Sequence, residues 1–303
     1  MHFYDVLWRA LHASAIFRLQ CDSRARVRGE FLDLSGVRLY YYAAGTRGAG
    51  VPAVFIHGFP TSSHLWNEII PLIPPGHRLV VLDLLGYGRS DRPGAHRVDA
   101  QAHAERVVAV LDELRISRAC VVGHGVGGGI AQLIATQFAS RVSHLALINS
   151  VGLDHWPSVS TRTARTLAPV AGFLPPSILT RVLRADVVRG YGDPERANRS
   201  IDLYLRPFDG PDGRNAAAAH IKGLPGIDTS ALASRLPAIA AQSAIVCGQH
   251  DRAIPPAVAR RLHEQIPGST LDIIPGARHF TPEEAPQQVA EAIERLLRRK
   301  PAD

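Results

Sequence analysis

Cysteine is scarce in this chain, and so are long apolar runs. The three cysteines, Cys21, Cys120 and Cys247, stand far apart among 303 residues, with no C-x-x-C motif and no histidine at metal-ligand spacing. This scattered, odd-numbered set argues against a disulfide framework and against a structural zinc site. Beyond the N-terminal segment, no stretch is apolar over the ~20 residues that a membrane-spanning helix needs. We therefore expect a cytoplasmic protein with no bound metal and no stable membrane insertion.

Clustered charge is missing as well, although the chain is basic. Its formal net charge is +7 and its sequence pI is about 9.8, yet the basic residues are almost all arginine and are spread along the chain. Such dispersal is typical of a composition bias, so we expect no nucleic-acid partner. A hydrophobic content of 46% with a charged content of 20% excludes wholesale disorder. The chain can bury a substantial core, as one large α/β domain with an insertion or as two small domains.

The first 30 residues are assigned to an N-terminal helix and its lead-in. Residues 1–20 are apolar, but Asp5, Arg9 and Arg18 interrupt them, and they lack the basic start and small-residue cleavage site of a signal peptide. The pattern predicts an amphipathic helix that packs on the body of the protein or on a partner chain. A weak contact with a membrane surface is the alternative interpretation.

From residue 31 onward, short apolar runs alternate with helical patterns. Residues 31–45 have period-two stretches of apolar residues on both sides of a Ser-Gly turn, and this pattern predicts a leading β-hairpin. Nearly continuous apolar runs follow: VPAVFIHG, HRLVVLDL, ACVVGH, SHLALINS, SAIVCGQHD and STLDIIPG. Helical periodicity separates most of them, at 63–73, 100–114, 126–138, 256–266 and 286–298. The pattern predicts an α/β protein with a doubly wound, mostly parallel sheet, whose site lies at the carboxyl ends of the strands.

One interval breaks this alternation. About ninety residues between SHLALINS and SAIVCGQHD contain no convincing buried strand, and this length lies well outside that of an ordinary connection between a strand and a helix. We interpret residues 152–236 as an inserted helical cap over the strand ends. The α/β core then has a first part, 31–151, and a second part, 237–303.

Five motifs stand at the ends of the predicted strands. They are HGFPTSSHLW (57–66), DLLGYGRSD (83–91), GHGVGG (123–128), GQHD (248–251) and GARHF (276–280). In order and spacing they resemble the α/β-hydrolase superfamily, and most closely its cap-bearing branch of haloalkane dehalogenases and epoxide hydrolases. The resemblance covers residues 31–298 and implies the α/β-hydrolase fold and an enzyme with a small-molecule substrate. It is strong evidence for the fold and far weaker evidence for the substrate.

The nucleophile that this resemblance implies is missing. In the pattern G-x-nucleophile-x-G, a strained turn from strand to helix carries the nucleophile between two small residues. Gly123 and Gly127 match the flanking positions, so Gly125 occupies the nucleophile position and offers no side chain. Members of the family that resemble this stretch carry serine there for an acyl-enzyme, or aspartate for an alkyl-enzyme ester. Neither attack is available to this chain.

The remaining parts of the family site are present. By resemblance, Asp251 is the acid and His279 is the base, and the backbone N–H groups of Phe59 and Val126 form an oxyanion hole. An aspartate that fixes the imidazole tautomer leaves the other ring nitrogen free to act as a general base near neutral pH. Backbone donors do not depend on the side chain of the nucleophile, so they remain when it is lost.

Other residues are candidates to line the substrate pocket or to replace the nucleophile. Ser150, after the strand next to the turn, is the substitute that we would test first, and a capping role is its alternative. In the cap, Trp156, Tyr191 and Tyr204 could line the pocket or pack in the interior of the lid. His57 precedes the oxyanion-hole residues and is a further pocket candidate.

A cofactor site is a competing interpretation of the same glycines. Gly123, Gly125 and Gly128 spell G-x-G-x-x-G after a predicted strand, as in proteins that bind nicotinamide or flavin dinucleotides. The following strand ends in Asn149 and Ser150, without an acidic residue for a ribose, and the other four motifs would be coincidence. We therefore expect no cofactor.

Four accounts fit a glycine at the turn with an intact His–Asp dyad. The first is an enzyme without covalent catalysis, which performs direct hydrolysis or lyase- or cyclase-type chemistry on a small apolar substrate. The others are a serine or aspartate hydrolase inactivated by replacement of residue 125, a non-catalytic relative that binds ligands, and a scaffold protein. We favour the active enzyme, because only the nucleophile is lost, while the acid, the base and the flanking glycines of the turn remain. We expect a monomer or a homodimer.

Overall fold

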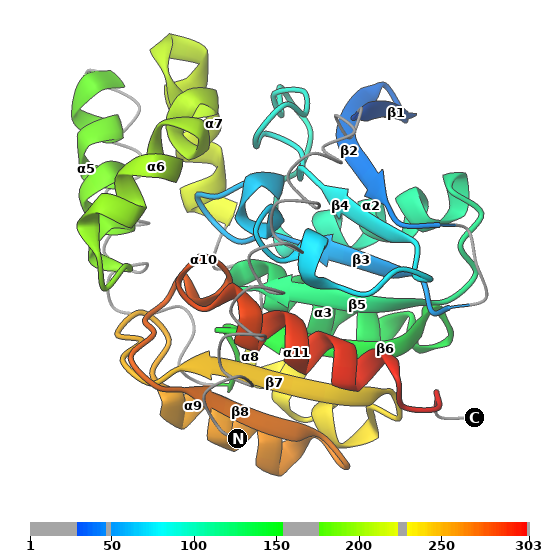
Figure 1. The fold of residues 1–303 in the computed structure, drawn as a ribbon. Coiled ribbons are helices and arrows are strands. Elements are labelled where there is room, and N and C mark those ends of the chain that lie inside the picture. The colour runs from blue at the N-terminus through cyan, green and yellow to red at the C-terminus, as the bar shows by residue number, and fades with distance from the viewer. Residues whose placement is uncertain (1–28, 47–49, 154–175, 224–228, 302–303) are drawn as a thin grey trace, which may run out of the picture.

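The computed structural model describes residues 29–46, 50–153, 176–223 and 229–301. The predicted N-terminal helix therefore lies outside the described residues. These residues form one eight-stranded sheet in the order β1-β2-β4-β3-β5-β6-β7-β8, with helices on both faces (Figure 1). The predicted doubly wound α/β architecture is confirmed.

The sheet is parallel except at one edge. β2 pairs antiparallel with both β1 and β4, and every other neighbouring pair is parallel, as predicted. The strands are β1 (Glu30–Leu34), β2 (Val37–Ala44), β3 (Ala53–Ile56), β4 (Leu79–Leu82), β5 (Ala119–His124), β6 (Val142–Ile148), β7 (Gln242–Gly248) and β8 (Thr270–Ile274). The central strands are buried along their whole length, because helices cover both faces, and this explains their continuous apolar runs.

The helices around the sheet lie close to their predicted positions. They are α2 (Ala100–Glu113), α3 (Val126–Gln137), α9 (Pro256–Gln265) and α11 (Pro286–Leu297). A short helix that was not predicted, α10 (Thr281–Glu284), precedes α11. Figure 1 shows α11 in front of the sheet, with α2 and α3 behind it. Asp99 begins α2 as its N-cap, since its side chain accepts a hydrogen bond from the N–H of Ala102. None of the helices in the described residues is long and apolar enough to cross a membrane.

The predicted helix at 63–73 is wrong in type. The structure has two 3-10 turns there, Ser63–Trp66 and Ile70–Leu72, in place of one α-helix. Pro71 lies inside the second turn, has no N–H to donate to a preceding carbonyl, and disfavours the α-helical conformation of the residue before it. The apolar spacing of this segment was therefore that of two tight turns packed on the core.

The described residues between β6 and β7 form four α-helices. They are α5 (Pro176–Arg189), α6 (Pro194–Leu205), α7 (Gly210–Gly223) and α8 (Thr229–Ala233). In Figure 1, α5, α6 and α7 stand together beyond the carboxyl ends of β5 and β7. A short 3-10 turn, Arg206–Phe208, joins α6 to α7. The Phe208 ring lies 6.1 Å from that of Phe59, so this turn reaches the loop after β3.

Candidate active site

The turn between β5 and α3 holds Gly125 at φ +56° and ψ −120°. The N–H of Gly125 donates to the carbonyl of Ile148 at 3.1 Å, and its own carbonyl accepts from the N–H groups of Gly128 and Val151, each at 3.1 Å. These hydrogen bonds tie the turn to the first turn of α3 and to the end of β6. The turn is thus held firmly at the carboxyl edge of the sheet.

The close packing around the turn leaves no room for a side chain at Gly123 or Gly127, but it does leave room for one at Gly125. A Cβ atom at Gly123 would overlap the backbone of Gly127, and one at Gly127 would overlap the backbone of His57. At Gly125, the nearest atom to an added Cβ would be His279 Nε2 at 3.7 Å, an ordinary contact distance. A side chain at position 125 would therefore fit, although the positive φ disfavours residues other than glycine.

Asp251 and His279 form a hydrogen-bonded dyad beside this turn. His279 Nδ1 lies 2.9 Å from Asp251 Oδ2, and the other ring nitrogen faces Gly125. The Asp251 side chain is fully buried, whereas that of His279 is 15% exposed. Asp251 follows β7, and His279 lies between β8 and α10. The structure thus brings the three residues together from separate parts of the chain.

The carboxylate of Asp251 is surrounded by donors. Its Oδ2 also accepts from Asn149 Nδ2 at 2.7 Å, and its Oδ1 accepts from the N–H groups of Ala253 and Ile254 at 2.8 and 2.9 Å. Because an ionised carboxylate only accepts hydrogen bonds, His279 Nδ1 carries the proton of the shared bond. The lone pair of His279 Nε2 is therefore directed toward the turn.

The dyad shifts the pKa values of both partners. Burial would raise the pKa of Asp251, but the charge and hydrogen bond of His279, with its other donors, hold that pKa below its ordinary value. Burial would likewise lower the pKa of His279, but the charge and hydrogen bond of Asp251 outweigh it. Smaller contributions from Asp186 and Glu284 act in the same direction, so the pKa of His279 is raised.

Two backbone N–H groups beside the turn, those of Phe59 and Val126, have no hydrogen-bond partner among the described residues. Val126 is the first residue of α3, where the helix dipole favours negative charge. A Cβ at Gly58 would lie only 3.4 Å from the nitrogen of Val126, so the two loops approach closely. Both N–H groups are thus available to an oxygen that gains negative charge.

His57 and His124 are engaged with the backbone. Because the N–H of Leu84 donates to His57 Nε2 at 3.0 Å, His57 Nδ1 carries a proton toward the carbonyl of Gly58 at 2.8 Å. His57 thereby fastens the loop after β3 to the loop after β4. His124 Nε2 lies 2.9 Å from the carbonyl of His279 and supports the loop of the base. Burial lowers the pKa of His124 to about 3, so its ring is neutral.

Ser150 lies beneath α3. Its hydroxyl donates to the carbonyl of Val151 and accepts from Gln132 Nε2, both at 2.9 Å. A Cβ at Gly128 would overlap the Ser150 side chain, which shows how closely the two pack. The hydroxyl is therefore engaged in packing α3 against the end of β6, and we place no nucleophile there.

The hydroxyl groups of Tyr191 and Tyr204 join the inserted helices to the core. Both donate to the buried carboxylate of Glu283 on α10, as does the hydroxyl of Ser200. The hydroxyl oxygens of Tyr191 and Ser200 each lie 2.9 Å from Glu283 Oε2. Trp156, the third aromatic pocket candidate, lies outside the described residues.

Asn149 and Glu283 are the residues that the sequence analysis did not select. Asn149 ends β6 at φ +44°, and its amide holds both the carboxylate of Asp251 and the carbonyl of Arg278. Its position at a strand end, next to the turn, was the available signal. Glu283 gave no comparable signal, because its partners come from residues about 80 to 90 positions away in the chain.

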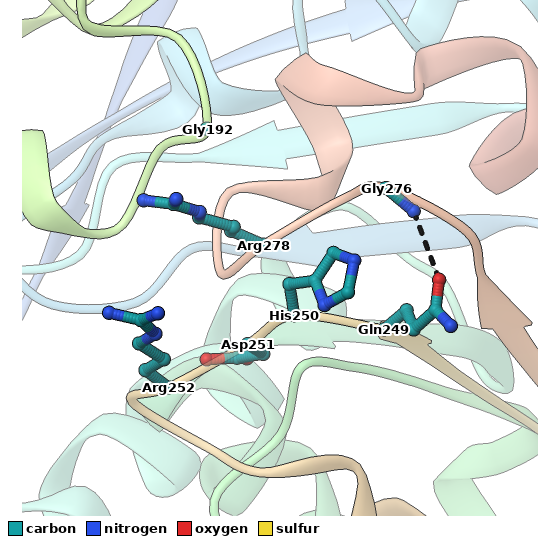
Figure 2. A pocket seen from close by; sticks show the side chains of 7 residues that line it. All are labelled: Gly192, Gln249, His250, Asp251, Arg252, Gly276 and Arg278. Carbon is teal, nitrogen blue, oxygen red and sulfur yellow. Dashed lines mark hydrogen bonds between the residues drawn. The ribbon is translucent and has the colours of Figure 1, made fainter.

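A separate hollow of about 720 Å³ lies beside the acid of the dyad. Its lining consists of Gly192, Gln249, His250, Asp251, Arg252, Gly276 and Arg278. Figure 2 shows the arginines extending to one side, with Gln249 hydrogen-bonded to Gly276 on the other. Gly125 and His279 do not line it. No three metal-ligating side chains come together in the described part of the chain.

Comparisons with known proteins identify the family of this chain and agree with its fold. The sequence model of the family described as alpha/beta hydrolase fold matches residues 52–286. The chain belongs to the α/β-hydrolase-fold family. Among solved structures, an α/β-hydrolase-fold protein from Burkholderia ambifaria has a TM-score of 0.78 at 28% identity, covering 88% of this chain and 99% of that one. An enol-lactonase from Burkholderia xenovorans has a TM-score of 0.74 at 20% identity, covering 89% and 100%, and shows the fold alone.

Characterised and uncharacterised hydrolases are among the relatives of this α/β-hydrolase. Haloalkane dehalogenase 2 of Mycobacterium tuberculosis is 28% identical over 277 residues, which cover 87% of this chain and 92% of the relative. An uncharacterised hydrolase of Bacillus subtilis is 26% identical over 271 residues, covering 86% and 94%. The family and these relatives support an assignment as a hydrolase.

Proposed function

We propose that this α/β-hydrolase hydrolyses a small carbonyl substrate without forming a covalent bond to the enzyme, with His279 as general base. The observation that carries the proposal is the open space at Gly125. A Cβ atom built on this residue would lie 3.7 Å from His279 Nε2, which is its nearest neighbour. A water molecule in that space lies within reach of the base, where other members of the family place a side chain. Asp251 orients the imidazole of His279 through its hydrogen bond to Nδ1 and leaves Nε2 to accept a proton.

The proposed reaction needs only groups that the site holds. His279 Nε2 takes a proton from water while the water oxygen attacks the carbonyl carbon of the substrate. The electron pair of the C=O bond moves to its oxygen, which accepts hydrogen bonds from the N–H groups of Phe59 and Val126. The tetrahedral intermediate then collapses, and the leaving oxygen receives the proton from His279. Ester and water thus become acid and alcohol.

The substrate class follows from these donors. A pair of backbone N–H groups suits the oxyanion that forms when an ester or a lactone is attacked. The same base could remove a proton next to a carbonyl, as lyase- or cyclase-type chemistry requires. Hydrolysis is the proposal because the family is that of the α/β-hydrolase fold and because haloalkane dehalogenase 2 and the uncharacterised hydrolase of Bacillus subtilis are among its relatives.

Removal of the dyad tests the proposal. On a panel of short-chain esters and lactones, we expect His279→Ala to lower kcat/KM by roughly 10²–10⁴-fold, the usual contribution of a general base. Asp251→Asn should lower it by a similar factor, because the tautomer of His279 is no longer held. His96→Ala, at an exposed histidine, is the control that should keep full activity. Wild-type rates in folded His279→Ala protein would remove His279 from the mechanism.

The structure also favours a second candidate, a hydrolase whose nucleophile at position 125 has been replaced. The turn keeps the backbone conformation of a strained strand-to-helix junction, and an added Cβ at Gly125 meets no atom closer than 3.7 Å. Serine there could form an acyl-enzyme, and aspartate could form an alkyl-enzyme ester. This candidate predicts an inert wild type and active variants.

Gly125→Ser and Gly125→Asp separate the two candidates. If the non-covalent proposal holds, either side chain fills the space for water and reduces wild-type hydrolysis at least tenfold, with no covalent adduct in rapid-quench mass spectrometry. Gly94→Ser is a matched control, since Gly94 also has positive φ and open space but lies on an exposed turn. A gain of hydrolysis with a covalent adduct, over an inert wild type, would establish the second candidate instead.

A further inference from the structure

Two buried histidines lie near the N–H groups of Phe59 and Val126. His103 comes from α2 and His220 from α7, and they are only 4% and 1% exposed. None of their four ring nitrogens meets the geometric criteria of a hydrogen bond with the described residues. One backbone contact of each ring, with Val98 for His103 and with Gly86 for His220, is close enough to raise the pKa of that ring slightly against the larger effect of burial. Their rings are stacked with centroids 6.2 Å apart, and the ring of Tyr87 lies 4.1 Å from that of His220.

Unpaired imidazole nitrogens of this kind are unusual inside a protein. Native structures pair nearly all buried polar groups, because a buried group without a partner loses the hydrogen bonds that it makes to water. The neighbouring His57 shows the usual arrangement, since Gly58 and Leu84 engage both of its nitrogens. His103 and His220 are therefore suited to a partner that enters from outside the chain.

The two histidines share a small cavity with the residues whose N–H groups lie beside the turn. Its volume is about 10 Å³, roughly the space that one water-sized group occupies. His103 and His220 line it together with Phe59 and Val126, and much of the remaining wall is apolar. A ligand whose carbonyl oxygen binds the two backbone N–H groups would thus have part of its chain next to this cavity.

The chemistry of the two rings selects the group that fits. Burial lowers the pKa of His220 to about 3 and holds the pKa of His103 well below its ordinary value, so both rings are neutral at pH 7. Each neutral imidazole has one N–H donor and one acceptor. A hydroxyl group also donates and accepts, and therefore complements them. A carboxylate only accepts, and its buried charge would stay uncompensated.

We propose that His103 and His220 form a subsite for a neutral hydroxyl group of the substrate, carried on the chain that leads away from the reacting carbonyl. The inference rests on the proposed function, because it places that carbonyl at the N–H groups of Phe59 and Val126. It narrows the substrate class to hydroxylated esters or lactones. Substrates with a plain alkyl chain or a carboxylate at that position bind less well.

Three ketones test the subsite without any turnover. 2-Pentanone, 5-hydroxy-2-pentanone and 4-oxopentanoate share a carbonyl on chains that end in methyl, hydroxyl and carboxylate. Calorimetric titration of the full chain should show the hydroxyketone binding about threefold to tenfold tighter than 2-pentanone, the effect of a neutral hydrogen bond. The carboxylate should bind more weakly than the hydroxyketone.

Variants locate the effect. His103→Phe and His220→Phe should bind the hydroxyketone no tighter than 2-pentanone, while His96→Phe, at an exposed histidine, should keep the wild-type preference. If a phenylalanine variant does not fold, ¹⁵N-labelled histidine in the wild type replaces it, because the hydroxyketone should shift the ring signals of His103 and His220 and 2-pentanone should not.

The outcomes separate this inference from the proposed function. Equal affinity of wild type for the two neutral ketones, tighter binding of the carboxylate, or binding of none of the three would overturn the hydroxyl subsite. Hydrolysis that depends on His279 could still be present in each of these cases. Conversely, a hydroxyl preference lost in His220→Phe would support the subsite even if His279→Ala keeps full turnover.

Discussion

At the scale of single residues, the shared proton of the dyad decides what the site can do. Asp251 accepts four hydrogen bonds and stays ionised, so His279 keeps its Nδ1 proton and leaves Nε2 unprotonated for the proposed role as a base. The same attraction raises the pKa of His279 and so stabilises its protonated form, which is no base. The charge that orients the base thus also delays its deprotonation.

A pH profile follows from this balance. Because the pKa of His279 is raised above ~6.5, kcat/KM for hydrolysis should rise with pH through a midpoint above that value and then level off. Asp251→Asn removes the main raising cause, so the residual activity should have its midpoint at lower pH. Initial rates from pH 5 to 9, with NMR titration of the His279 ring, measure both. A midpoint unmoved by Asp251→Asn would contradict the assigned cause.

At the scale of elements, Glu283 joins the inserted helices to the core. Burial raises the pKa of Glu283, while the hydrogen bonds from Tyr204, Tyr191 and Ser200 partly lower it again. Tyr191 follows α5, and Ser200 and Tyr204 lie on α6, so one carboxylate on α10 binds two inserted elements. Its distance from His279 along the chain is only four residues. The anchor of these helices therefore lies next to the base.

Removing one hydroxyl should loosen this anchor. We expect Tyr204→Phe to lower the free energy of unfolding by about 1–3 kcal/mol, because a hydrogen bond to a buried carboxylate is lost. Hydrogen exchange should become faster in α6 before it does so in the sheet. Tyr42→Phe removes a comparable hydroxyl, bonded to Asn67 at 3.1 Å, and should leave exchange in α6 unchanged. Equal acceleration in both variants would argue against a local anchor.

At the scale of the whole molecule, the order of strands and helices was predictable and some local geometry was not. Continuous apolar runs identified β3 to β7 because both faces of each strand are covered, and this leaves a strong pattern in the chain. The segment at 63–73 was misassigned because apolar spacing does not distinguish one helix from two turns. The glycine flanks of Gly125 were predictable because steric demand leaves only one residue type.

Local periodicity and motif spacing were sufficient to predict the elements, their order and the positions of Gly125, Asp251 and His279 after predicted strands. Which distant groups meet could be seen only in the folded chain. Asn149 reaches Asp251 across 102 positions of the chain, and His103 meets His220 across α2 and α7. Such pairs depend on how separate elements pack, because a hydrogen bond requires its atoms to lie within a few tenths of an ångström of their preferred distance.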